Sequence, residues 1–294
     1  MLNRRRSLVL GGSSLTLPLF APGLIGPGRI AFAQMSSSRT GATVSDDMPP
    51  LLPGMEPFAN DADKPIVGVD PLGTEEPPEF KKATALKIIS DVMADPATRR
   101  PYDFALWFRD MGQGKYGKDY APYARAWPTE YNPLVVAFFR ATKTTPQGDT
   151  TSWCAAFINF CIALAVAKAA GHTYGPPGKE FSDDVLSKGT KSASSGSFRC
   201  WPGNKAPEGT STPKLGDIVV WALNGTVNGC SYDRGHVAFF ERFDEDRIIV
   251  IGGNQGPLDT SRQSGVTRRV IGKTFARSEG TVTFHSFRTA DVLV

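Results

Sequence analysis

The chain has 294 residues, of which 40% are hydrophobic and 21% are charged, with 33 basic and 29 acidic side chains. This composition predicts one globular domain with extra segments, or at most two small domains, and excludes a chain too polar to bury a core. Residues 1–33 hold four of the 33 basic residues and no acid, so without them both signs number 29. A nearly neutral protein lacks the basic surface that nucleic-acid binding needs, and no nucleic-acid partner is expected.

Residues 1–33 are typical of an export signal. They have a basic start, an apolar middle interrupted by Gly, Ser and Pro, and the small-residue cleavage pattern AFA at their end. The arginine pair followed by SLV resembles a bacterial twin-arginine signal, which exports proteins that have already folded. The apolar runs are too short and too broken to span a bilayer, although an uncleaved anchor is the alternative. We therefore expect a periplasmic or secreted protein with no stable membrane span after signal removal.

A tether and one folded domain are expected after the signal. Residues 34–78 are rich in Pro, Ser, Gly and Asp and lack a sustained apolar period, which predicts a flexible tether. Residues 79–294 show regular apolar patterns and are expected to form the domain. Because no pattern indicates a coiled coil or an extended apolar surface, we expect a monomer.

Three helices are expected at the start of this domain. Helical spacing of apolar residues runs from Glu79 to Pro96, at Phe80, Ala83, Leu86, Ile89 and Val92. Short helices are expected at residues 103–111 and 134–142.

A fourth helix is expected over the segment that begins SWCAAFINFC. It should start at an N-cap provided by Thr151 or Ser152 and stop at Gly171. Because it is apolar nearly all round, it should be central and buried. It carries Cys154 in its first turn and Cys161 seven residues further on. Seven residues span about 10.5 Å along a helix, which is too far for a disulfide between them.

The pattern changes to that of strands after a loop-rich stretch from His172 to Pro213. Runs typical of strands lie at residues 215–223, 235–243, 246–253, 265–272 and 281–287. Turn residues separate these runs, which indicates a mostly antiparallel sheet. The sequence therefore predicts an α+β fold, with helices first, a sheet second and one core.

The remaining two cysteines are the better disulfide candidates. Cys200 and Cys230 lie in Gly-rich, loop-like segments. An exported protein folds in an oxidising compartment, so we expect these two residues to be paired.

Cys154 is the candidate nucleophile. A cysteine attacks as the thiolate, and both a helix N terminus and a neighbouring imidazolium lower the pKa of a thiol. Cys161 lies two turns deeper among apolar residues, where burial keeps a thiol neutral. Trp153 is either a core residue or part of the groove wall, and is the candidate substrate-binding residue.

A thiolate nucleophile needs a base within hydrogen-bond reach and a group that orients this base. Of the three histidines, His236 is the candidate base, because it opens a strand whose start can face a helix N terminus. His172 lies roughly 27 Å along the helix from Cys154, and His285 lies inside the last strand. The strand after His236 ends near Asn254, whose amide is the candidate orienting group.

Each of these residues also has a structural alternative. Cys154 could be a small buried thiol on a core helix, His236 a strand-end histidine with a satisfied ring, and Asn254 a turn residue that tolerates left-handed backbone. No HExxH or CxxC motif and no Gly-rich phosphate loop after a strand occurs, so neither a metal nor a cofactor is expected.

Four segments in chain order resemble the CHAP domains, which are cysteine- and histidine-dependent amidohydrolases and peptidases. The segments are SWCAAFINF, LGDIVVWA, RGHVAFFE and VIGGNQG. The resemblance covers residues 127–256 and includes the upstream WPTEYNPLVVAFFRAT. CHAP domains are related to the NlpC-like peptidases, so the resemblance implies a papain-like fold.

The resemblance also implies a mechanism and a substrate class. Cys154 would be the nucleophile, His236 the base and later the acid, and Asn254 the residue that orients the ring. The Cys154 backbone N–H would help to bind the oxyanion. The substrate would be an amide bond of peptidoglycan, in its stem or cross-link peptides or between peptide and sugar. Many relatives carry an acid where this chain has Gly252, and the segment 171–213 is longer than in minimal CHAP domains.

The leading prediction is therefore an exported thiol hydrolase that cuts peptidoglycan. A catalytically silent module that binds wall peptides in the same groove is one alternative. A thiol amidase or peptidase with a substrate outside the wall is another. Which amide bond is cut, and in whose wall, does not follow from these patterns.

Overall fold

The computed structural model describes residues 73–149, 151–201, 212–223, 234–257, 264–277 and 280–289 of the chain. They all belong to the unit Pro50–Val294. The expected export signal, the expected tether up to residue 72, and Cys230 lie outside these ranges. Within the ranges, no helix is long and apolar enough to cross a membrane.

The end of the expected tether is part of the folded domain. Glu75 forms an isolated parallel bridge with Glu130. Gly73 packs so closely against Asp149 that a Cβ at position 73 would lie 2.4 Å from the carboxylate. The boundary expected at Glu79 is therefore too late, because the chain already pairs with the domain from Gly73 on.

The helices predicted from apolar spacing are all present. They are α1 (Glu79–Ala94), α2 (Pro101–Gly112), α3 (Pro133–Phe138) and α4 (Cys154–Ala169). The stretch predicted to be loop-rich also contains the short α5 (Asp183–Ser187) and the 3-10 turn η3 (Ser195–Cys200). Two further 3-10 turns are η1 (Ala121–Ala124) and η2 (Phe139–Ala141).

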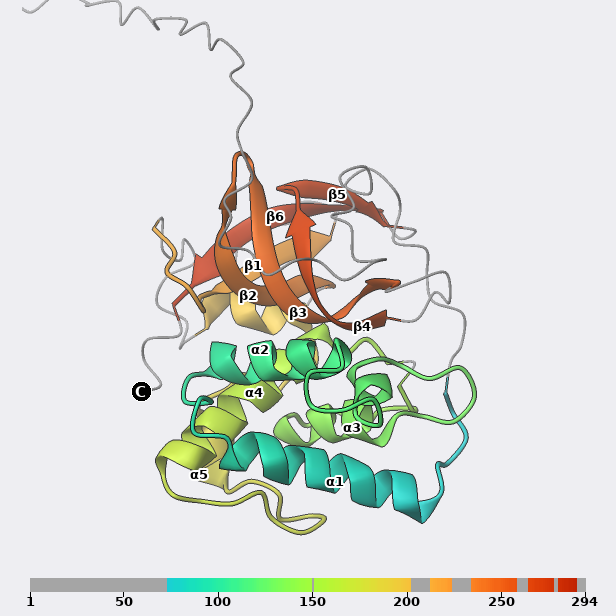
Figure 1. The fold of residues 1–294 in the computed structure, drawn as a ribbon. Helices are drawn as coiled ribbons and strands as arrows, with labels where there is room; N and C mark the ends of the chain where they lie inside the picture. Colours follow the sequence, from blue (N-terminus) through green and yellow to red (C-terminus); the bar gives the residue numbers. More distant parts are fainter. Residues whose placement is uncertain are drawn as a thin grey trace, which may run out of the picture. The chain divides into compact units, whose positions relative to one another are not determined.

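The strands form one antiparallel sheet, as predicted. They are β1 (Ile218–Leu223), β2 (Gly235–Asp244), β3 (Arg247–Pro257), β4 (Ser264–Ile271), β5 (Thr274–Arg277) and β6 (Gly280–Arg288). Their spatial order is β4-β3-β2-β1-β6-β5, and every neighbouring pair is antiparallel. Figure 1 shows a strongly curved sheet with the helices gathered on one side of it. The α+β architecture is confirmed, and β5 was not predicted.

Strand alternation divides the core into two hydrophobic clusters. The first cluster joins the helices to one face of the sheet; from β1 and β2 it contains Ile218, Val220, Val237 and Phe239. The second cluster lies on the other face; from the same strands it contains Val219, Trp221, Ala238 and Phe240. Alternate residues of each strand point to opposite faces, so both faces of the sheet carry buried apolar side chains.

α1 buries only part of the face that its predicted spacing marks, at Ile89 and Val92. Its buried residues are Ala85, Ile88, Ile89 and Val92. Phe80 and Leu86 belong to the predicted spacing, but they are 67% and 45% exposed. The apolar period predicts the helix correctly, whereas the contact with α3 decides which face is covered.

α4 is the central buried helix, as predicted. It contacts α2, α3, β2 and β3, and most of its residues are fully buried. It stops at Gly171, whose φ is +73°. The Gly171 N–H donates to the Lys168 carbonyl, and the His172 N–H donates to the Ala167 carbonyl. These two bonds form a Schellman motif, which requires left-handed backbone at the glycine.

Candidate active site

Cys154 is the first residue of α4, and Trp153 is the N-cap. The predicted N-caps, Thr151 and Ser152, are therefore wrong. The Thr151 hydroxyl instead accepts a hydrogen bond from the Gln147 backbone N–H at 3.0 Å, which closes the preceding loop. Cys154 carries a thiol that forms no disulfide, and the residue is 5% exposed. It lies at the helix end where backbone N–H groups have no helical acceptor and favour negative charge.

Cys161 has a different environment, as predicted. It is a free thiol and fully buried. Burial raises the pKa of the Cys161 thiol well above its ordinary value. Cys200 is disulfide-bonded. Because Cys230 lies outside the described residues, its pairing with Cys200 stays a prediction.

Trp153 is a core residue. It has no exposed surface, and its ring lies 5.7 Å from the Phe138 ring and 6.4 Å from the Phe157 ring, centroid to centroid. It also touches Gly253 of β3, where an added Cβ would lie 2.4 Å from Trp153 Cζ3. The assignment of Trp153 as a substrate-binding residue is therefore corrected, because packing between α3 and β3 leaves none of the ring for a substrate.

β3 contains a bulge at Asn254. Gly252 pairs with Thr267 of β4, and Gln255 pairs with Gly265, so three steps along β3 match two along β4. Asn254 lies within this extra step, and its φ of +55° is in the left-handed region. The bulge interrupts the alternation of β3, so the side chain of Gln255 emerges on the side of Gly252.

His236 is held at the start of β2. Its ring is buried, and it lies 5.8 Å from the ring of Trp221, its partner across β1 and β2. Its Nε2 lies 3.0 Å from Nε2 of Gln255. Gln255 Oε1 accepts a hydrogen bond from Thr267 Oγ1 at 3.0 Å. Three polar side chains therefore form a line across β2, β3 and β4.

Gln255 is the candidate that strand alternation did not predict. The sequence assigned the orienting amide to Asn254, but within the described ranges the Asn254 side chain makes no hydrogen bond to His236, whereas Gln255 does. Adjacent glycines and an asparagine within a strand pattern are a signal for a bulge, and this signal could have indicated Gln255.

Residues 252–255 of β3 are contacted both by the residue before Cys154 and by His236. The N-cap residue before Cys154 packs on Gly253, and His236 contacts the Gln255 amide. A Cβ at Gly253 would meet the first hydrophobic cluster, whereas one at the preceding residue would meet the second. The candidate site therefore lies where the two clusters of the core adjoin.

Asn159 anchors the long segment after α4 to the helix that carries Cys154. Its Nδ2 donates to Thr190 Oγ1 at 3.0 Å and to the Ser192 carbonyl at 2.9 Å. Its Oδ1 accepts from the Thr190 backbone N–H at 2.7 Å. Gly189 is packed so closely that a Cβ there would lie 2.4 Å from Asn159 Oδ1. Because Asn159 is buried, these bonds fix the chain at 189–192 against α4.

Comparison with protein families finds a similarity over the segment that contains Cys154 and His236. Residues 145–254 match the family model of the CHAP domain. The chain contains a CHAP domain. This domain includes α4, the segment anchored by Asn159, β1, β2 with His236, and β3 as far as Asn254. A comparison with curated proteins and with solved structures found no match. A CHAP domain indicates a hydrolase in general, an amidase or peptidase with a peptidoglycan-related substrate.

Asp149 is a buried carboxylate in the part of the CHAP domain that leads to Cys154. Its Oδ2 accepts hydrogen bonds from the backbone N–H groups of Trp127 and Asn132, at 2.9 and 2.8 Å. Burial raises the pKa of Asp149 to about 6, although these two hydrogen bonds oppose the shift. Asp149 therefore ties the approach to α4 to the chain just before α3.

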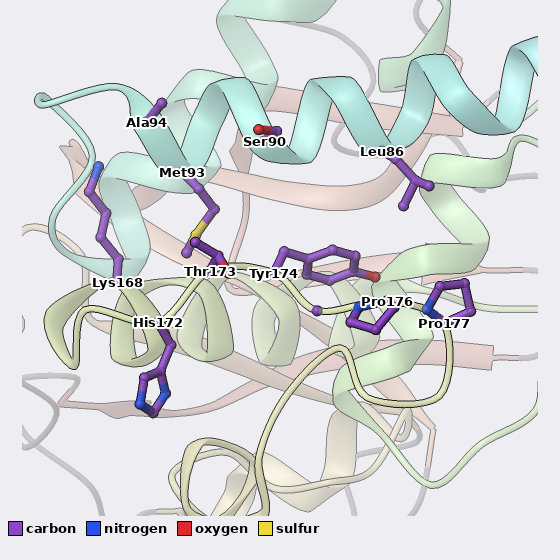
Figure 2. Close-up of a pocket in the computed structure, with 11 residues that line it drawn as sticks. Leu86, Ser90, Met93, Ala94, Lys168, His172, Thr173, Tyr174, Pro176 and Pro177 are labelled. Carbon is purple, nitrogen blue, oxygen red and sulfur yellow. The ribbon is translucent and has the colours of Figure 1, made fainter.

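A cavity of about 400 Å³ lies at the other end of α4. Figure 2 shows its lining by α1 and by the chain around the end of α4, including Leu86, Met93, Lys168, His172 and Tyr174. Lys168 is fourteen residues from Cys154, which is about 21 Å along a helix. The cavity is therefore separate from the candidate active site of the CHAP domain.

Metal ligands do not gather in the described part of the CHAP domain or its surroundings. Within the described ranges, no group of three or more His, Cys, Asp or Glu side chains is placed to hold a metal ion. The polar groups described at the site are a thiol, an imidazole, an amide and a hydroxyl.

Proposed function

We propose that the protein is an exported thiol hydrolase that cleaves amide bonds in peptidoglycan, with Cys154 as the nucleophile and His236 as the base. One observation carries this proposal: the Cys154 thiol begins a buried helix, and the N-cap residue of this helix packs on Gly253, two residues from the Gln255 amide that contacts the His236 ring. The CHAP match over residues 145–254 supports the substrate class. The packing of α4 on an antiparallel sheet also suits a papain-like fold.

The proposed reaction has two stages. His236 takes the thiol proton, and the Cys154 thiolate attacks the amide carbonyl carbon to form a tetrahedral oxyanion. Backbone N–H groups at the start of α4 can stabilise this charge. The C–N bond then breaks, the leaving amine receives the proton from His236, and a thioester remains on Cys154. A water molecule that gives a proton to His236 hydrolyses the thioester, which releases a carboxylate and restores the thiol.

Replacement of the nucleophile is the first test. Cys154→Ser should reduce the release of soluble fragments from isolated sacculi by at least about 100-fold, because a serine hydroxyl is much harder to deprotonate than a thiol. Cys161→Ala is the matched control, since it removes the other thiol of α4 at a position away from the helix N terminus, and it should keep most of the activity. Mass spectrometry of the fragments identifies the new chain ends and hence the bond that is cut. If Cys154→Ser digests sacculi as well as the parent protein, the nucleophile assignment is wrong.

Thiol alkylation separates an enzyme from a silent module that only binds wall peptides. In the folded protein near neutral pH, iodoacetamide should modify Cys154 much faster than Cys161, whose thiol is buried and neutral. A binding module needs no activated thiol, so a Cys154 rate no higher than that of an unfolded cysteine peptide would favour this alternative. An activated Cys154 together with intact sacculi would instead indicate an amide substrate outside the wall.

A further inference from the structure

We infer that Gln255 is the positioning residue of His236 and that Thr267 sets the orientation of the Gln255 amide, an assignment that rests on the proposed role of His236 as the base. The resemblance implies this role for Asn254. In many relatives an acid occupies the position of Gly252. In this chain the bulge in β3 brings the amide of the following residue to the ring instead.

The contact joins three buried side chains on neighbouring strands. His236 lies on β2, Gln255 on β3 and Thr267 on β4. One end of the amide is 3.0 Å from His236 Nε2, and the other end is 3.0 Å from Thr267 Oγ1. Buried polar groups cost free energy when they are left unpaired. Each of the two contacts therefore satisfies buried polar atoms on both of its sides.

The amide has room because residue 252 is glycine. A Cβ at Gly252 would lie 2.7 Å from Gln255 Nε2 and 2.8 Å from Ala238 Cβ. A side chain at position 252 would therefore compete with the Gln255 amide for one space. The absence of an acid at Gly252 and the presence of the amide at Gln255 are two parts of a single arrangement.

An amide that is bound by a hydroxyl can serve two states of the imidazole. In the structure Thr267 donates to Gln255 Oε1, and the amide nitrogen faces His236 Nε2. This orientation suits a neutral ring whose Nε2 accepts a hydrogen bond. A half-turn of the amide presents Oε1 to a protonated Nε2, and the Thr267 hydroxyl then accepts from the amide nitrogen. Since a hydroxyl both donates and accepts, both contacts of the amide are kept in either orientation.

The second orientation is the one that proton transfer from Cys154 requires. In this orientation the neutral ring carries its hydrogen on Nε2 and donates it to Gln255 Oε1, so the lone pair of Nδ1 can take the thiol proton, and the resulting imidazolium still donates from Nε2. The other orientation suits the tautomer that carries its hydrogen on Nδ1, which leaves no nitrogen for the thiol proton. In the second orientation Gln255 Oε1 accepts from Nε2 and keeps the ring plane fixed. A neutral amide stabilises the imidazolium less than a carboxylate would. The amide therefore orients the base without locking it in the protonated state.

Nitrogen-15 NMR of the folded protein tests this role without any substrate. The chain has three histidines, so the His236 ring signals can be assigned by their loss in His236→Gln. Gln255→Ala should shift the His236 Nε2 signal and change the pH midpoint of the ring titration. Gln255→Glu should raise that midpoint by about one pH unit, because a carboxylate favours the imidazolium. Thr267→Val should disturb the same signals less, since the amide remains.

Asn254→Gly is the matched control. Glycine keeps the left-handed backbone of the bulge and removes the neighbouring amide. The His236 signals should keep their parent values in this variant. On sacculi, Gln255→Ala should lower the rate by roughly 10- to 100-fold because the base is misplaced, and Gln255→Glu should recover part of it with an optimum at higher pH.

The inference is overturned if Gln255→Glu leaves the His236 titration unchanged, or if Asn254→Gly changes the ring signals and Gln255→Ala does not. The proposed function is tested separately. If the parent protein leaves sacculi intact but the NMR results are as expected, the proposed function is wrong and the positioning of His236 by Gln255 stands. If Gln255→Ala does not fold, Gln255→Glu and Thr267→Val still decide the question, because both retain most of the side-chain volume.

Discussion

At the scale of single residues, Asp149 should make the stability of the folded protein depend on pH, independently of the proposed reaction at Cys154. Its pKa is raised from 3.8 to about 6 because the carboxylate is buried. The folded state therefore binds this proton more tightly than the unfolded state does. As the pH rises from about 4 to 6, the folded protein should lose stability, on the order of 3 kcal/mol from this group, and the loss should persist above pH 6.

Asp149→Asn should remove most of this pH dependence. The amide has almost the same shape, and its oxygen can still accept from the backbone N–H groups of Trp127 and Asn132. Urea unfolding at pH 4, 5, 6 and 7 measures the effect. The free energy of unfolding should fall across this range in the parent protein more than in Asp149→Asn. Equal slopes in the two proteins would contradict a raised pKa of the buried Asp149 carboxyl.

The residues of the candidate site were predictable to different degrees for physical reasons. Cys154 and Cys161 could be distinguished because position along a helix determines both burial and dipole. His236 could be selected because few histidines exist and only one opens a strand. Gln255 could not be selected, because the direction of its side chain depends on a register shift between β3 and β4. The residue pattern of β3 alone does not reveal such a shift.

At the scale of elements, α4 and β3 meet at a contact that tolerates only glycine. An added Cβ at Gly253 would lie 2.4 Å from Trp153 Cζ3 and 2.8 Å from Phe157 Cβ. Gly253→Ala should therefore lower the free energy of unfolding by about 1–3 kcal/mol through overpacking. It should also displace the N terminus of α4 and reduce the reactivity of Cys154.

Trp153→Phe is the compensating change, because phenylalanine lacks the indole carbons that the new methyl group would strike. The double variant should be more stable than the sum of the two single effects predicts. Urea unfolding of the parent, both single variants and the double variant measures this coupling. Strictly additive effects would show that Trp153 and Gly253 do not share the contact.

The fold was largely predictable at the level of elements, and packing explains the exceptions. The long apolar segment of α4 and the alternating runs of β1, β2, β3, β4 and β6 carry their periods in the sequence. β5 has four residues, too few for a period to be recognised. The buried face of α1 depends on its contact with α3, and so the spacing that includes Phe80 and Leu86 could not predict it.

At the scale of the whole molecule, the proposed export rests on residues 1–33, which lie outside the described ranges. Replacement of the arginine pair by Arg5→Lys with Arg6→Lys keeps the charge but removes the guanidinium groups, which lysine does not replace in specific recognition. If the signal is of the twin-arginine type, the precursor should stay in the cytoplasm. Cell fractionation with an antibody to the folded domain measures this, and Arg4→Lys is the matched control. Unchanged export of the double variant would indicate a different route.

The anchor at Asn159 divides the segment between α4 and β1 into parts with different freedom to vary. Residues 176–179 are exposed, whereas Tyr174 and Phe181 on either side of them pack on Phe160 of α4, so a change of length disturbs least between these two side chains. Thr190 and Ser192 instead satisfy a buried amide on the helix that carries Cys154. A deletion that reached them would leave this amide without partners, at a cost of about 1–3 kcal/mol. A loop exchanged with a related protein should therefore end before Gly189, so that residues 189–192 keep their hydrogen bonds to Asn159 of α4.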